Sequence, residues 1–211
     1  METQFNFKKI NHLFYVFCCF PWVSFSILGS DSQPWYTILG IIIIISSSNI
    51  FITKPIIYAL SSTIIGVLLA IFFNQNLPIL VLKNIYNFSS FYVVLIVSFS
   101  LLKKQLSKEL VTNIFRISNY IYIFFAFVQI ISPGLIKFIC NFQTSSDRGL
   151  TSLTPEPGYF GMYLIFSSMI ILCLNNFSFK RNIALHYMNL FSIVFLALST
   201  MNTLYLIIFF L

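Results

Sequence analysis

The sequence is poor in charged residues: of its 211 residues, 12 are Lys or Arg and only 5 are Asp or Glu. Charged residues make up 8% of the chain, whereas a soluble globular domain carries roughly 25%. So few charges cannot cover a surface that faces water, and a soluble fold is therefore excluded. The low charge, together with only 7 Gly and 7 Pro, also excludes a disordered, collagen-like or coiled-coil chain.

Metal-ligand patterns are absent from the sequence. It has 2 His and 4 Cys, and none of them forms a CxxC motif or a Cys/His spacing typical of a metal site. Most of the cysteines lie in apolar runs, where a thiol behaves as a small hydrophobic group. We therefore expect no metal and no cofactor.

Long apolar runs are abundant, since 58% of the residues are hydrophobic. A helix needs about 20 mostly apolar residues to cross a bilayer core of ~30 Å. Seven runs meet this requirement, and an eighth begins near Thr203 and is still apolar at Leu211. The predicted spans cover residues 10–30, 35–53, 56–73, 85–102, 117–136, 158–175 and 183–199. We expect an all-α integral membrane protein, a single transmembrane domain of seven to eight spans, that forms the N-terminal portion of a longer protein.

The few charges predict the orientation of these spans. With a cytoplasmic N-terminus, the inner side holds nine cations and two acids, and the outer side holds three of each. Membrane proteins carry such an excess of Lys and Arg on the cytoplasmic side. The net charge of +7 is thus a topology signal, and we expect no nucleic-acid partner.

The longest polar stretch, residues 137–157, lies on the outer side in this topology. Ten consecutive residues of this stretch contain Asp147, Arg148 and Glu156, although the chain has very few ionisable groups. Ionisable groups at the face of such an apolar protein are candidates for function.

The end of this loop has the pattern of a helix start. Thr154 is the expected N-cap, Pro155 the first helical residue, and Glu156 a carboxylate in the first turn, where the helix dipole favours it. Gly158 and Gly161 would leave one helix face bare for a neighbour or a ligand. From this pattern alone, a well-capped helix start without further function is the favoured interpretation.

The stretch Arg148–Gly161, RGLTSLTPEPGYFG, resembles a segment of bacterial O-antigen polymerases and the related O-antigen ligases. In that family an outer-loop Arg precedes a short Gly-containing stretch and an acid–Pro pair at the start of a span. The turn Leu198–Thr203 resembles a later Ser/Thr/Asn-rich turn of the family. The resemblance implies a multi-pass protein of the bacterial inner membrane that polymerises the repeat units of O-antigen, capsule or exopolysaccharide.

The resemblance also implies a chemistry. A metal-independent glycosyltransferase would transfer a glycan from an undecaprenyl-pyrophosphate donor to a lipid-linked sugar acceptor at the outer face. Arg148 would bind the leaving pyrophosphate, which a guanidinium contacts with two hydrogen bonds. Glu156 would activate the attacking hydroxyl or orient Arg148, and Asp147 is the alternative for this role. The implied partners are the lipid-linked oligosaccharide, membrane lipids and a polysaccharide chain-length regulator. The expected substrate-binding residues are Asp147, Gly158, Tyr159, Asn202 and Thr203.

Two other functions remain open. A transporter or flippase for polysaccharide units would share the membrane topology, although the absence of charge from the predicted spans argues against proton coupling. A non-enzymatic membrane subunit of polysaccharide export would use residues 137–157 for docking.

Isolated polar residues inside the spans have structural interpretations. We expect Asn119 and Gln129 to form interhelical hydrogen bonds. His186 is expected to be a packed or interfacial residue. The stretch 103–116 is predicted to be either an amphipathic segment on the membrane surface or an extension of the following helix.

Overall fold

The computed structural model describes residues 2–23, 34–47, 50, 52–73, 78–104, 108–139 and 149–197. Within these ranges the chain has eight α-helices, one 3-10 helix, one π-helix and no strand, which confirms the predicted all-α fold. The contacts divide the chain into two compact units. Unit 1 comprises Met1–Phe14 and Pro34–Leu106, and unit 2 comprises Tyr15–Gln33 and Ser107–Leu211.

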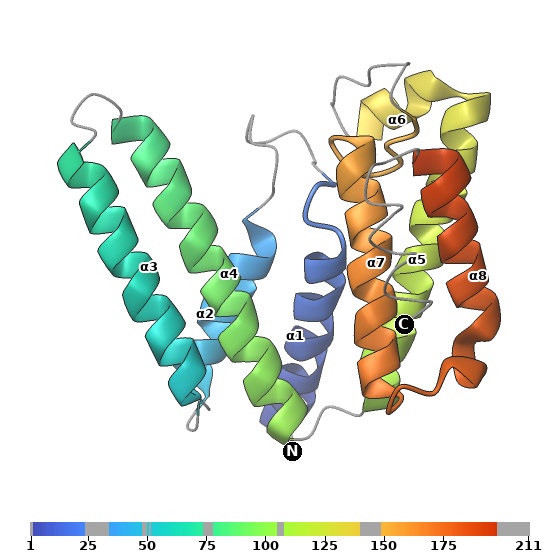
Figure 1. The fold of residues 1–211 in the computed structure, drawn as a ribbon. Helices are drawn as coiled ribbons and strands as arrows, with labels where there is room; N and C mark the ends of the chain where they lie inside the picture. The colour runs from blue at the N-terminus through green and yellow to red at the C-terminus, as the bar shows by residue number, and fades with distance from the viewer. Residues whose placement is uncertain are drawn as a thin grey trace. The chain divides into compact units, whose positions relative to one another are not determined.

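Figure 1 shows the helices coloured in their order along the chain. The elements are α1 (Glu2–Cys19), α2 (Trp35–Ser46), α3 (Lys54–Phe73), α4 (Pro78–Lys104), α5 (Lys108–Ile131), α6 (Pro133–Ile139), α7 (Pro157–Leu174), the 3-10 helix η2 (Phe179–Asn182), α8 (Ile183–Phe191) and the π-helix η3 (Ser192–Ala197).

Unit 1 is built on α4, against which both α2 and α3 pack. The chain reverses direction from α2 to α3 and again from α3 to α4, so that the C-terminal ends of α2 and α4 and the N-terminal end of α3 lie at one end of the unit (Figure 1). A hydrogen bond of 2.6 Å joins the hydroxyls of Thr63 on α3 and Tyr92 on α4. Gly40 is buried on α2, and a Cβ there would lie 2.4 Å from Val93 Cγ1.

Unit 2 has an aromatic core between α5 and α7. Tyr122 is fully buried, and its ring lies 4.2 Å from that of Tyr163 and 5.4 Å from that of Phe20. Its hydroxyl donates to the Cys19 carbonyl over 2.9 Å, so this fully buried tyrosine is also satisfied as a donor. The helix α8 contacts both α7 and α5, and the π-helix η3 packs against α7.

Proline ends two helices earlier than the apolar runs predicted. The helix α1 ends at Cys19, two residues before Pro21, although the run was predicted to be helical from residue 10 to 30. The predicted span 117–136 is broken at Ser132, because Pro133 cannot donate a helical hydrogen bond and instead begins α6. At its N-terminal end, α5 already includes residues 108–116, which favours the helix-extension interpretation of that stretch.

Two of the described helices are long and apolar enough to cross a membrane, α5 with 24 residues and α7 with 18. The other described apolar stretches are shorter: Ile10–Cys19, Trp35–Ser46, Lys54–Leu69 and Ser89–Lys103. The helix α2 has 12 residues, which is about 18 Å at 1.5 Å per residue. Large apolar side chains also lie on the outside of both units. Ile45 is 78% exposed, Phe72 74% and Ile131 85%.

Candidate functional site

Residues 149–156, within the stretch that carries the sequence resemblance, form a turn before α7 that is buried at residues 151–154. Thr151 is 1% exposed, and Ser152 and Thr154 are fully buried. These three residues belong to the stretch 137–157 that was predicted to be an outer loop. Each of their side chains is hydrogen-bonded within unit 2, either to α5 or within the turn itself.

Gln129 on α5 fixes the turn. Its Oε1 atom accepts from the backbone N–H of Thr151 over 3.0 Å and from that of Ser152 over 2.8 Å. Its Nε2 atom donates to Thr151 Oγ1 over 3.2 Å. The Ser152 hydroxyl donates to the Tyr122 carbonyl, also on α5. Gln129 was expected to form a hydrogen bond between two helices. Instead, its amide accepts from backbone N–H groups of the turn, which have no partner in a helix.

Two residues of the turn adopt left-handed backbone conformations. Gly149 has φ +98°, and a Cβ at this position would lie 2.5 Å from the Ala197 carbonyl oxygen. The adjacent Leu150 N–H donates to the Leu196 carbonyl over 2.8 Å. Ser152 has φ 53°, an uncommon value for a residue with a Cβ, and is held by the bonds to α5. Such conformations persist only where the surroundings fix them, and here the contacts with α5 and η3 do so.

The turn ends at the start of α7, two residues later than predicted. Pro157 is the first helical residue, and Glu156 is the N-cap, with extended backbone and no capping bond from its side chain. The Thr154 hydroxyl does not cap the helix; it donates to the Thr151 carbonyl over 2.7 Å and to the Glu156 carbonyl over 2.8 Å. The Thr154 hydroxyl already bonds within the turn and therefore does not cap α7. The first helical residue is a proline, which has no N–H that needs a partner. The Glu156 side chain is exposed.

Next to Glu156, the first turn of α7 carries an open face. A Cβ on Gly158 would meet no atom within 4 Å. The Tyr159 side chain is 42% exposed, and its ring lies 5.7 Å from that of Trp22 at a tilt of 42°. The aromatic neighbour fixes one side of the Tyr159 ring and leaves part of it accessible. Three predicted site residues, Glu156, Gly158 and Tyr159, are thus together and accessible.

The other predicted site residues lie outside the described ranges. They are Asp147, Arg148, Asn202 and Thr203. Sequence reasoning did not assign Trp22 or Gln129 to this site. A lone amide in an apolar run was the only signal for Gln129, and nothing in the sequence indicated that Trp22 would pack on Tyr159.

A second polar cluster joins α5, α7 and α8 within unit 2. Ser167 Oγ donates to Asn119 Oδ1 over 2.7 Å, and Asn189 Nδ2 donates to Ser168 Oγ over 2.6 Å. The Asn119 bond confirms the expected interhelical role of that residue. Asn119 Nδ2 and Asn189 Oδ1 are buried and have no hydrogen-bond partner. His186, on α8, is 1% exposed, in agreement with a packed histidine.

Among the described side chains, no group of three or more His, Cys, Asp or Glu residues is placed to hold a metal ion. The arrangement before α7 can instead present a carboxylate and an aromatic ring from a rigid support. Comparison of the chain with protein families, curated proteins and solved structures finds no match.

Proposed function

We propose that this chain is part of a multi-pass enzyme of the bacterial inner membrane that extends polysaccharides. It transfers a glycan from an undecaprenyl-pyrophosphate carrier to a lipid-linked sugar acceptor at the outer face. One observation supports this most directly. Within the stretch that resembles the O-antigen polymerases, residues 149–156 form a turn that is hydrogen-bonded to α5, and this turn is followed at the start of α7 by the exposed Glu156 carboxylate and a partly exposed Tyr159 ring.

The proposed topology has seven to eight spans and a cytoplasmic N-terminus. The excess of cations on one set of connections supports it, as does the exposure of large apolar side chains that a lipid environment would cover. Within unit 1, α3 begins at Lys54 and α4 ends just after Lys103, both at the same end of the unit, as that topology requires (Figure 1).

In the proposed reaction, an acceptor hydroxyl oxygen forms a bond to the anomeric carbon of the donor sugar. The bond from that carbon to the pyrophosphate oxygen breaks, and the electron pair leaves with the pyrophosphate. Arg148 stabilises this developing charge through paired hydrogen bonds. Glu156 accepts the proton of the attacking hydroxyl, because its carboxylate is exposed at the outer end of α7. Asp147 is the alternative base.

Sugar binding is assigned to the groups around Glu156. The exposed part of the Tyr159 ring offers an apolar face to a pyranose ring, and Gly158 leaves room for close approach. Asn202 and Thr203 are proposed to hydrogen-bond sugar hydroxyls. Membrane lipids and a polysaccharide chain-length regulator are the proposed partners.

The test is to replace the two proposed catalytic residues in the full chain and measure glycan length in the native host. Arg148→Lys keeps the charge but loses the two-point contact, and Glu156→Gln keeps the size but loses the base. We expect each to reduce chain extension about 100-fold, the scale of losing one transition-state contact. Arg181→Lys and Glu109→Gln are matched controls, since both residues are exposed and lie far from α7's first turn in the sequence. An unchanged length distribution in Arg148→Lys contradicts the catalytic role.

A transporter for the same lipid-linked glycan is the second candidate, favoured by the buried cluster of Asn119, Ser167, Ser168 and Asn189. Polar groups in the interior of a membrane bundle often mark a substrate path. In an extension-defective Arg148→Lys strain, a polymerase leaves single repeat units exposed outside the inner membrane. A transporter defect, expected instead in Asn189→Leu, leaves the units inside. A docking subunit would show neither pattern, and the same variants would lose a co-purifying partner.

A further inference from the structure

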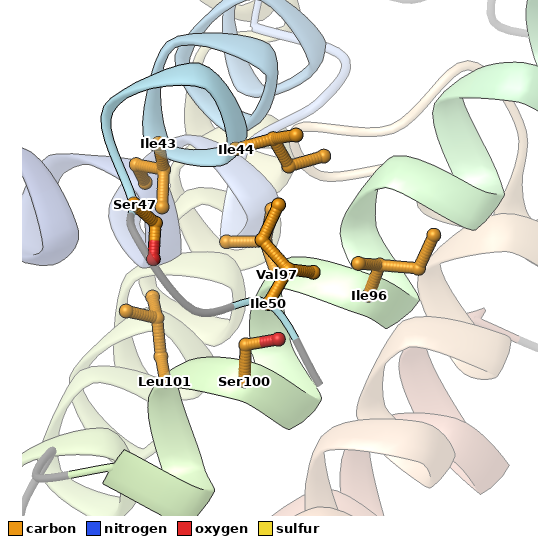
Figure 2. Close-up of a pocket in the computed structure, with 8 residues that line it drawn as sticks. All are labelled: Ile43, Ile44, Ser47, Ile50, Ile96, Val97, Ser100 and Leu101. Carbon is orange, nitrogen blue, oxygen red and sulfur yellow. The ribbon is translucent and has the colours of Figure 1, made fainter. Parts of the chain in front are cut away.

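Unit 1 contains a groove between α2 and α4 that the proposed reaction does not use. Figure 2 shows its walls: Ile43 and Ile44 from α2 face Ile96 and Val97 from α4, and Ser47 and Ser100 stand toward one end. The enclosed part of the groove is small, about 20 Å³, and the remainder is open to the surroundings of unit 1. Its apolar lining suits a hydrocarbon chain that lies along the open side.

The groove follows from the tight contact of the two helices at Gly40. There the helices lie so close that a Cβ would reach within 2.4 Å of Val93 Cγ1. Straight helices that cross at one point separate on either side of it. The groove begins three residues after Gly40 on α2 and three residues after Val93 on α4.

The end of the groove near Ser47 and Ser100 is basic. Ser100 and Lys103 are three residues apart on α4 and therefore share a helix face, and the Lys103 side chain is exposed. Ile50 also lines the groove, and the exposed Lys54 follows four residues later at the start of α3. The sequence from residue 34 to 106 contains no Asp or Glu, and unit 1 as a whole has one acidic residue, Glu2, against six lysines. The net charge of this unit therefore favours an anionic ligand.

We propose that the groove binds one acyl chain of an anionic phospholipid, whose phosphate is held by Lys103 and Lys54. The hydrocarbon lining disfavours a soluble anion, and the lysines disfavour an uncharged or zwitterionic lipid. The two serines lie at the level between chain and phosphate, where the ester groups of the lipid would be. This inference rests on the proposed membrane location of unit 1, with this end cytoplasmic, and is independent of glycan transfer.

The experiment measures lipid binding to the full-length chain in detergent by native mass spectrometry. The probes are phosphatidylglycerol, phosphatidylcholine with the same acyl chains, and glycerol phosphate. Each cation near a membrane surface contributes about 1 kcal/mol toward an anionic lipid, which is about fivefold in affinity. We therefore expect phosphatidylglycerol to bind about 30-fold more tightly than phosphatidylcholine through the two lysines. Glycerol phosphate should not compete.

Three variants separate the parts of the site. Lys103→Gln and Lys54→Gln should each lower the affinity for phosphatidylglycerol about fivefold and leave phosphatidylcholine unchanged. Ser100→Leu fills the groove and should weaken both lipids; if it fails to fold, Ser47→Leu on the opposite wall makes the same test. Lys180→Gln is the control, because Lys180 is exposed but belongs to unit 2.

Three outcomes overturn the proposal. They are equal binding of the two lipids, competition by glycerol phosphate, and an equal loss in Lys180→Gln and Lys103→Gln. Chain extension reports separately on the enzyme. If phosphatidylglycerol binds as expected while Arg148→Lys extends glycans normally, the proposed function is wrong and the lipid site in the groove is retained. If Arg148→Lys loses chain extension while phosphatidylglycerol does not bind as expected, only the lipid site is wrong.

Discussion

Gly149 shows how a single residue limits what this chain can accept before α7. Glycine adopts a φ of +98° without the strain that a side chain would cause, and the Ala197 carbonyl already occupies the space where a Cβ would lie. The residue belongs to the stretch that resembles the polymerases and directly follows Arg148. The geometry therefore gives a structural reason for glycine at this position, separate from any contact with substrate.

The first prediction is that Gly149→Ala destabilises unit 2 by about 3 kcal/mol, through backbone strain and the clash with a carbonyl. The measurement is unfolding in mixed micelles, followed by Trp22 fluorescence in a Trp35→Phe background. Gly158→Ala is the matched control, because a Cβ there meets nothing within 4 Å. It should leave stability unchanged or raise it by up to about 1 kcal/mol. Equal effects of the two alanines would rule out the strain at Gly149.

The second prediction concerns Gln129, the anchor of the turn. Gln129→Leu leaves the buried N–H groups of Thr151 and Ser152 without their acceptor, at about 1–3 kcal/mol for each. Unit 2 should lose stability, and chain extension should fall as Glu156 loses its rigid support. Gln129→Glu in its protonated form keeps an acceptor oxygen and a donor, so it should recover most of the loss. A Leu variant as stable as the Glu variant would show that the turn does not depend on this amide.

At the scale of elements, α5 and α7 are joined by polar bonds as well as by aromatic packing. The bond from Ser167 to Asn119 is buried between the two helices. Hydrogen bonds between membrane helices contribute modestly, about 0.6 kcal/mol on average and up to about 1.7 kcal/mol. The bond therefore fixes the relative register of the helices more than it stabilises the unit.

The third prediction follows from that bond. A double-mutant cycle with Ser167→Ala and Asn119→Ala should give a coupling energy of about 0.6 to 1.7 kcal/mol. The readout is unfolding of unit 2 in mixed micelles. Ser178→Ala, in the exposed connection after α7, is the control and should not couple to Asn119→Ala. A coupling energy of zero for the first pair would mean that the bond does not form in the membrane protein.

The fourth prediction concerns the contact of α2 with α4. Gly40→Leu should destabilise unit 1 by roughly 1–3 kcal/mol, since a Cβ alone already meets Val93 at 2.4 Å and Phe14 at 3.2 Å. Trp35 on α2 reports on this unit in a Trp22→Phe background. Gly66→Leu on α3 is the control, because the space around Gly66 is open. If both leucine variants unfold alike, the close approach at Gly40 is not real.

For the whole molecule, the proposed function depends on which residues face each side of the membrane. The fifth prediction uses a cysteine-free chain and a maleimide that does not cross membranes. Glu156→Cys should be labelled from the outside. Lys54→Cys and Lys103→Cys should be labelled only after the membrane is opened. Labelling of the Glu156→Cys variant from the cytoplasmic side would remove the outer-face site, and with it the proposed glycan transfer.

Sequence alone gave the class of the fold and the approximate position of most helices. A helix satisfies its backbone hydrogen bonds within itself, so an apolar run of sufficient length determines a helix without knowledge of its neighbours. Prolines that end helices also act locally, and Pro21 and Pro133 each lie two residues after the last residue of α1 and of α5. The distribution of Lys and Arg among the connections also predicted a membrane topology, because that distribution depends only on position along the chain.

Tertiary structure decided the details of the site. The turn before α7 is polar in sequence but buried, because an amide 22 residues earlier supplies its hydrogen bonds. Gly149 is fixed by a carbonyl from η3, and Tyr159 by a tryptophan from the segment after α1. The α2–α4 groove likewise exists only because two helices cross at Gly40. Contacts between residues far apart in the chain set each of these features, and no local pattern records which distant group will be the partner.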